Sequence, residues 1–152
     1  MDKRAEFSAA MKEAMKSKDA VALSTIRLIM AALKDRDISA RGVGKTEAIE
    51  ESDILSMLST MITQRQESLK TYRDAGREDL AGREEEEIQI IQRFMPKQLS
   101  DSELETIVAA LVKKTGAQGI KDMGKVMNVL KADYAGQVDM AKAGAAVKKK
   151  LG

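Results

Sequence analysis

Hydrophobic residues recur every three or four positions along most of this chain, and polar residues fill the positions between them. The pattern is clearest after Ser52, where the apolar positions are Leu55, Leu58, Ile62, Leu69 and Tyr72. An α-helix repeats every 3.6 residues, so this spacing places the apolar side chains on one helix face. No segment shows a convincing strand pattern. The pattern therefore predicts an all-helical protein.

Capping residues divide the pattern into seven expected helices. Ser and Asp side chains favour helix starts, and glycine favours helix ends. Ser100 and Glu103 have the spacing of a capping box. The glutamate run at 84–87 is interpreted as the start of the fourth helix rather than a metal site, because acidic residues stabilise a first turn. The other expected caps are Asp2, Asp19, Ser52, Asp122 and Asp139, and the expected ends are Gly42-Val43-Gly44, Gly76 and Gly116.

The single proline, Pro96, separates two parts of the pattern. We expect an N-terminal helical domain of about four helices over residues 1–97 and a small three-helix bundle over 98–152. The remaining apolar stripes are Phe7, Met11 and Ala14 or Met15; Ala22, Ile26, Met30 and Leu33; Ile88, Ile91, Phe94 and Met95; Leu104, Ile107 and Leu111; Met123, Met127, Leu130 and Tyr134; and Met140, Gly144, Val147 and Leu151.

The amino-acid composition limits the kinds of core, catalytic group and metal site that this chain can form. The chain has 10 methionines but only two tyrosines, two phenylalanines and no tryptophan, so the core is expected to be aliphatic. Cysteine and histidine are absent, which excludes disulfides, thiol nucleophiles, imidazole bases and the usual zinc ligands. We expect no cofactor and no metal. No apolar run is long enough to span a membrane, and the first residues do not resemble a signal peptide. These features favour a cytoplasmic protein.

No catalytic group stands out. Residues 39–46 end in Gly44-Lys45-Thr46, but a phosphate-binding loop needs a glycine where Ser39 stands. We therefore reject that motif. Serines have no histidine partner, and paired carboxylates occur at spacings typical of solvated helix faces. We identify no catalytic residue, although a carboxylate or Ser–Lys site that depends on tertiary contacts stays open.

Two basic features remain. Arg27, Lys34 and Arg41 recur every seven residues and share one helix face, which is either a solubilising stripe or a binding surface. Arg65 occupies a step of the apolar series between Ile62 and Leu69. Its guanidinium either snorkels into solvent, pairs with a glutamate or faces a functional cleft.

The tail resembles the domain shared by GatB and the YqeY family. The residues that carry the resemblance are Asp122-Met-Gly-Lys-Val-Met127, Asp139 and the terminal Val147-Lys-Lys-Lys-Leu151. Upstream stretches are also similar to YqeY: residues 26–33, 64–72, 75–80 and 87–96. GatB is a subunit of the glutamine-dependent amidotransferase that corrects misacylated tRNA.

The resemblance implies a tRNA-associated accessory protein, with tRNA or aminoacyl-tRNA, an amidotransferase or an aminoacyl-tRNA synthetase as candidate partners. It associates the family with carbon–nitrogen ligase activity that uses glutamine as amide donor. This chain has no room for the amidase subunit or the transfer domain, so independent catalysis is not expected. A protein–protein adaptor without RNA is the alternative. Relatives often carry a basic residue near the Ala-Gly-x-x-Asp turn, where this chain has Gln137.

The basic side chains supply candidate RNA contacts. Residues 100–152 carry nine basic and six acidic side chains, a net charge of +3. Lys142 and Lys149 are seven residues apart, and with Lys125 they are expected to form a shallow cationic patch that binds phosphates. The candidate nucleic-acid-binding residues are Lys125, Lys131, Lys142, Lys148, Lys149, Arg27, Lys34 and Arg41.

Overall fold

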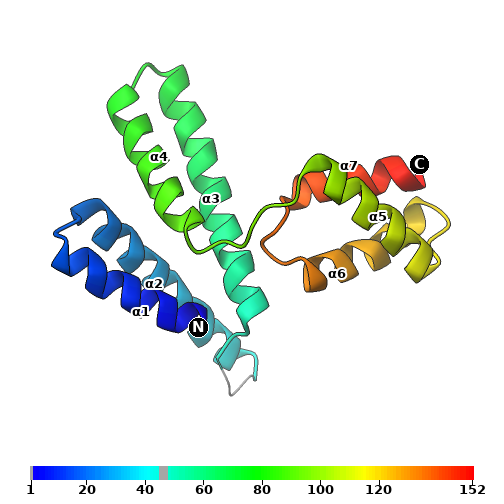
Figure 1. The fold of residues 1–152 in the computed structure, drawn as a ribbon, viewed down its shortest axis with the longest axis horizontal. Helices are drawn as coiled ribbons and strands as arrows, with labels where there is room; N and C mark the ends of the chain where they lie inside the picture. The colour runs from blue at the N-terminus through cyan, green and yellow to red at the C-terminus, as the bar shows by residue number, and fades with distance from the viewer. Residues whose placement is uncertain (1, 45–47) are drawn as a thin grey trace. The chain divides into compact units, whose positions relative to one another are not determined.

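The computed structural model describes residues 2–44 and 48–152, which form seven α-helices, one short 3₁₀ helix and no β-strand (Figure 1). The all-helical prediction is confirmed. Lys45 and Thr46 of the rejected phosphate-loop motif lie outside these residues. The helices are α1 (Lys3–Lys16), α2 (Ala20–Gly42), α3 (Glu51–Asp74), α4 (Glu78–Gln92), α5 (Asp101–Thr115), η1 (Ile120–Asp122), α6 (Met123–Asp133) and α7 (Met140–Leu151).

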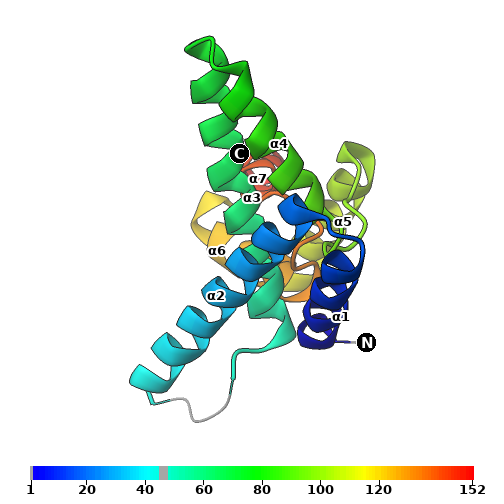
Figure 2. The same ribbon diagram turned by 90° about the vertical axis from the view of Figure 1, so that its left-hand side faces the viewer.

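The helices form two compact units, Met1–Met95 and Pro96–Gly152, and each has its own apolar core. In the first unit α1 packs along α2, α3 packs along α4, and α2 contacts both α3 and α4 (Figure 2). Phe7 and Phe94 meet edge to face in this core, with ring centroids 5.0 Å apart. No helix among the described residues combines the length and apolar content that a bilayer span requires.

Most expected helix ends are confirmed. The carboxylates of Asp2 and Asp19 accept hydrogen bonds from Ala5 N and Ala22 N at 2.8 and 3.0 Å. Ser100 and Glu103 form both bonds of the capping box. Gly76 and Gly116 take left-handed φ angles of 73° and 69° after α3 and α5.

Three expected helix caps differ from the structure. Glu50, and not Ser52, is the N-cap residue of α3, which begins at Glu51. The glutamate run at 84–87 does not begin α4, which starts earlier at Glu78. Glu78 and Asp79 supply the acidic first turn instead, because the chain re-enters a helix directly after Gly76. Asp122 precedes α6 but makes no side-chain cap bond to it. Its carboxylate accepts a hydrogen bond from Gln118 N at 3.0 Å and closes the turn before η1.

The predicted apolar stripes lie near the buried side of each helix, but at several positions the buried residue is the neighbour of the predicted one. In α3 the buried residues are Ile54, Met57, Leu58 and Met61, whereas Leu55, Ile62, Leu69 and Tyr72 are half-buried. Ile29 replaces Met30 as the fully buried residue of α2, and Val126 replaces Met127 in α6. Met15 and Met140 are exposed. Adjacent helix positions lie 100° apart, so two neighbouring apolar residues can flank the same broad apolar face, and the packing of the other helices decides which of them is buried.

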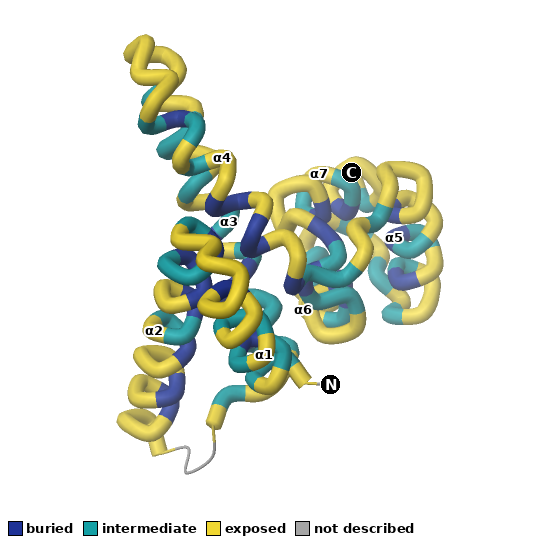
Figure 3. The backbone as a smooth tube through the Cα atoms, turned by 60° about the vertical axis from the view of Figure 1, so that its left-hand side comes forward, coloured by how far each residue is buried: buried dark blue, intermediate teal, exposed yellow. Residues whose placement is uncertain are grey.

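Burial is uneven along the first unit. Figure 3 shows the outer side of α2 exposed over its C-terminal half, with buried positions confined to the side that faces the other helices. The far end of the α3–α4 hairpin is almost entirely exposed. The core of this unit therefore lies where α1 and α2 meet the ends of α3 and α4 nearest Ile54 and Ile91.

Candidate nucleic-acid interface

The second unit is an antiparallel arrangement of α5, α6 and α7, so its helix ends gather at two opposite poles. A Cβ built on Gly152 would lie 3.9 Å from Cδ1 of Ile120, which places the end of α7 beside η1. Leu99 N donates to Gln137 O at 2.7 Å, which ties the start of α5 to the α6–α7 connection at the other pole. The C-terminal ends of α5 and α7 therefore share one pole with η1 and the first turn of α6.

Seven lysines lie at this pole, and all seven are exposed. We call this surface the basic end; it comprises Lys113, Lys114, Lys121, Lys125, Lys148, Lys149 and Lys150. Asp122 is the single acidic side chain among them, so the side chains of the basic end carry a formal charge of +6. Lysines in the last turns of α5 and α7 also face the negative ends of those helix dipoles, which stabilises the cations where they stand.

Asp122 is the acidic side chain that the lysines of the basic end surround, and its pKa is affected by them. The hydrogen bond from Gln118 N holds the pKa of this carboxyl below its ordinary value, and the charges of Lys125 and Lys121 add to the effect. The nearest cation is Lys125 Nζ, 3.8 Å from Asp122 Oδ1. The other six lysines make no ion pair within 4 Å with any carboxylate of residues 2–44 and 48–152. Their charges are available to an anionic partner.

The opposite pole is acidic. Five carboxylates lie there, at the starts of α5 and α7 and at the end of α6: Asp101, Glu103, Glu105, Asp133 and Asp139. Three lysines accompany them, Lys97, Lys131 and Lys142, and leave a formal charge of −2. The second unit thus carries opposite charges at its two poles.

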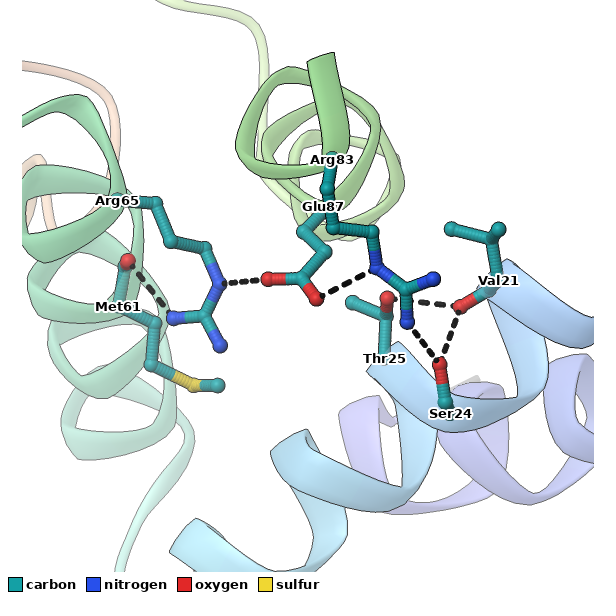
Figure 4. Close-up of polar contacts among 7 residues, drawn as sticks. All are labelled: Val21, Ser24, Thr25, Met61, Arg65, Arg83 and Glu87. Carbon is teal, nitrogen blue, oxygen red and sulfur yellow. Dashed lines mark hydrogen bonds and ion pairs between the residues drawn. The ribbon is translucent and has the colours of Figure 1, made fainter. Parts of the chain in front are cut away.

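The first unit contains a partly buried ionic network between three helices (Figure 4). Arg65 Nε of α3 donates to Glu87 Oε2 of α4 at 3.0 Å, and Arg83 Nε donates to the other oxygen at 3.2 Å. Arg83 Nη2 also donates to Ser24 Oγ of α2 at 3.0 Å. The side chains of Arg65 and Glu87 are only 15% and 12% exposed. The pairing interpretation of Arg65 is therefore confirmed.

This network is suited to holding helices together. Glu87 receives one guanidinium on each oxygen, and Arg65 Nη1 also donates to Met61 O at 3.1 Å. Burial raises the pKa of the neighbouring Glu84, the charge of Glu87 raises it further, and Arg65 opposes the shift. Among residues 2–44 and 48–152, no group of acidic side chains has the arrangement of a metal site.

A family model matches nearly the whole chain. The family model described as "Yqey-like protein" matches residues 4–151. The chain belongs to the YqeY family.

Yeast proteins are among the curated relatives of this YqeY-family chain. A protein of Vanderwaltozyma polyspora is 32% identical over 120 residues, which cover 74% of this chain and 62% of the relative. A protein of Lachancea thermotolerans is 31% identical and one of Saccharomyces cerevisiae 28%, over 74% and 73% of this chain and 59% and 61% of their own lengths. This chain therefore spans about three fifths of the length of these relatives.

The relatives correct the expected location. All three are named "Altered inheritance of mitochondria protein 41, mitochondrial", which contradicts the cytoplasmic expectation. That expectation came from composition and from the lack of an apolar span. Neither property distinguishes one aqueous compartment from another.

The predicted lysines of this YqeY-family protein divide between the two poles. Lys125, Lys148 and Lys149 belong to the basic end, while Lys131 and Lys142 lie at the acidic pole. Lys142 is in the first turn of α7, about 10 Å along the helix axis from Lys149, so it does not join Lys125 in one patch. Arg27, Lys34 and Arg41 are exposed on α2, in the other unit.

Sequence reasoning missed four members of the basic end. Lys113 and Lys114 stand in the last helical turn before Gly116, and Lys150 belongs to the terminal run of lysines, so all three can be found from the sequence. Lys121 lies in η1, an element that the hydrophobic pattern did not predict. The signal that was overlooked is topological: two parallel helices joined through one antiparallel helix place their C-terminal lysines side by side.

Proposed function

We propose that this protein is an RNA-associated accessory protein that contacts tRNA through the basic end of its C-terminal unit. The observation that carries the proposal is the concentration of seven exposed lysines around one acidic side chain at one pole of this unit. The residue-level similarity of the tail to GatB supports tRNA as the class of RNA.

The chemistry of the basic end favours backbone recognition. Lysine is a flexible point charge that pairs with phosphates without reading bases. The only aromatic residue of this unit, Tyr134, is half-buried against the core and follows α6 at the acidic pole, so it offers no stacking platform at the basic end. Binding by this surface is therefore expected to be tolerant of sequence and strongly dependent on salt.

Because the two poles carry opposite charges, a matched pair of variants, one at each pole, can test the proposal. We would change Lys114, Lys121 and Lys149 of the basic end to Gln, and compare this variant with one carrying Gln at Lys97, Lys131 and Lys142. Each variant loses the same charge, and all six lysines are exposed. Folding should therefore be nearly unchanged in both, which circular dichroism would check.

Binding of unmodified tRNA would be measured across a salt series. Neutralising three phosphate contacts should flatten the slope of log K against log salt by about two to three units. The variant at the acidic pole should keep the wild-type slope. Equal slopes for the two variants, or wild-type binding that does not respond to salt, would remove the basic end as the RNA surface.

An adaptor function is the second candidate, and a specific observation favours it. The exposed side of α2 presents apolar and basic residues in a regular register that the core of its own unit does not use. Participation in a carbon–nitrogen ligase rests on the family association alone.

A further inference from the structure

The exposed face of α2 carries a regular seam. Its positions follow spacings of four, three, four and three, and they are Arg27, Ala31, Lys34, Ile38 and Arg41. This is the spacing by which one helix packs along another in a coiled coil. We call these five residues the α2 seam. It extends about 21 Å along the helix axis, enough to receive roughly four turns of a partner helix.

The α2 seam lies opposite the core. All five residues are exposed, and Ile38 is 52% exposed. The buried residues of the same stretch include Ile29, Leu33 and Ala40, and Ile29 and Leu33 belong to the apolar core of the unit. Given 100° per residue, the two sets project from opposite sides of α2. The seam is therefore not part of the core of its own unit.

The residue types of the α2 seam indicate which residues a partner helix should present to it. Cations occupy one position of each heptad, and the apolar residues Ala31 and Ile38 occupy the other. A partner helix with acidic residues opposite the cations and apolar residues opposite Ala31 and Ile38 would satisfy both sets. Ala31 has a small side chain, which allows a helix to approach closely at that level.

Nucleic acid fits this surface less well. Phosphates would pair with Arg27, Lys34 and Arg41. Ile38, which lies between Lys34 and Arg41 in the seam, and the flanking Leu28, which is 46% exposed, would gain nothing from a phosphate backbone. Contact with another apolar side chain removes an aliphatic side chain from water, and this lowers the free energy. The alternation of cationic and apolar positions therefore favours a protein partner.

We propose that the α2 seam is the docking site for an acidic amphipathic helix of a partner protein. The recognition elements are carboxylates at one heptad position and aliphatic side chains at the other. This surface is separate from the basic end, so the proposal does not depend on RNA binding by the C-terminal unit.

The test uses the full chain and helix-stabilised synthetic peptides of about three heptads. One peptide has Leu at a and Glu at d, and the second has the reverse, which covers parallel and antiparallel docking. A scrambled peptide of identical composition, without the four-three spacing, is the control for charge alone. We expect one of the two ordered peptides to bind at least about tenfold more tightly than the scrambled peptide, a difference of about 1.4 kcal/mol.

Variants then locate the site. Lys34→Glu combined with Arg41→Glu should weaken binding of the ordered peptide by about tenfold or more, and Ile38→Ser should weaken it without a charge change. The matched control is Lys12→Glu with Lys16→Glu on the exposed side of α1, which makes the same charge change and should leave binding within about twofold.

Three results would overturn the proposal. The first is that neither ordered peptide binds, or that the scrambled peptide binds equally well. The second is that the seam variants and the α1 control bind alike. The third is that the seam variants lower tRNA binding while peptide binding is unchanged, which would assign the α2 seam to RNA.

Discussion

The Asp37 side chain of α2 accepts three hydrogen bonds in the first unit. Its two oxygens accept from Arg4 Nη1 and Nη2, each at 2.9 Å, and Oδ1 also accepts from Ile49 N at 3.0 Å. One carboxylate thus ties α1, α2 and the segment before α3 together. The Arg4 hydrogen bonds hold the pKa of Asp37 below its ordinary value, against the opposing effect of burial.

The sign of this shift gives a pH prediction. A carboxyl whose pKa is lowered by folding stabilises the protein above its unfolded pKa, and that contribution is lost as the pH falls through the folded pKa. We expect Asp37→Asn to cost about 1–2 kcal/mol at pH 6, because it removes the ion pair but keeps an acceptor for Ile49 N.

The difference between Asp37→Asn and wild type should begin to shrink as the pH falls below the ordinary aspartate pKa of about 4. It should be lost as the pH falls through the lowered pKa of the folded protein, where the wild-type carboxyl also becomes neutral. Urea unfolding at a series of pH values measures it. A difference that stays constant down to pH 2 would show that Asp37 contributes through packing and not through its charge.

At the scale of the helices, Glu87 is the residue on which α2, α3 and α4 converge. Its carboxylate lies between Arg65 and Arg83, and Arg83 reaches Ser24 of α2 (Figure 4). Removing one partner of a buried ion pair is costly because it leaves the other charge buried and unpaired. The two partners of Glu87 are not equivalent, since Arg65 is 15% exposed and Arg83 is 49% exposed.

This asymmetry predicts an order of stabilities. Glu87→Met should cost about 3 kcal/mol because it strands the buried Arg65. Arg65→Met should cost less, about 1–2 kcal/mol, because Arg83 still pairs with Glu87. Arg73→Met, which breaks the exposed 2.9 Å pair with Glu85, should cost about 0.5 kcal/mol. Chemical denaturation of the three variants checks the order, and equal costs for Arg65→Met and Arg73→Met would contradict it.

At the scale of the whole molecule, the composition limits which catalytic side chains the chain can supply. The cationic residues gather on a different surface in each of the two units. The chain has no histidine and no cysteine, so an imidazole base or a thiolate nucleophile is unavailable to it. The positive charge concentrates at one pole of the C-terminal unit, while the cations of the first unit include the α2 seam. Each unit therefore has a cationic surface of its own.

The purified protein is accordingly expected not to hydrolyse glutamine. A glutaminase needs an activated nucleophile, and the usual cysteine is absent from this sequence. Ammonia release in the presence of glutamine should equal the protein-free blank. Release above the blank that a single substitution abolishes would reveal a catalytic site that neither sequence nor geometry has indicated.

Much of the fold was predictable because helix signals are local. Asp19, the Ser100–Glu103 box and Gly116 act within one turn of their own positions, and each was identified from sequence. Lys18 gave no such signal, although it takes a left-handed φ of 57° in the turn between α1 and α2. The packing of that hairpin sets its backbone, and packing is not local.

Residue types and short-range spacing were enough to establish the helical class, the family, a mainly aliphatic core and the absence of thiol and imidazole chemistry. Tertiary structure decided which of two adjacent apolar residues is buried, that Arg65 shares Glu87 with Arg83, and which lysines meet at the basic end. The physical reason is the same in each case. Pairing and charge accumulation depend on distances between helices, and a helical repeat fixes only the distances within one.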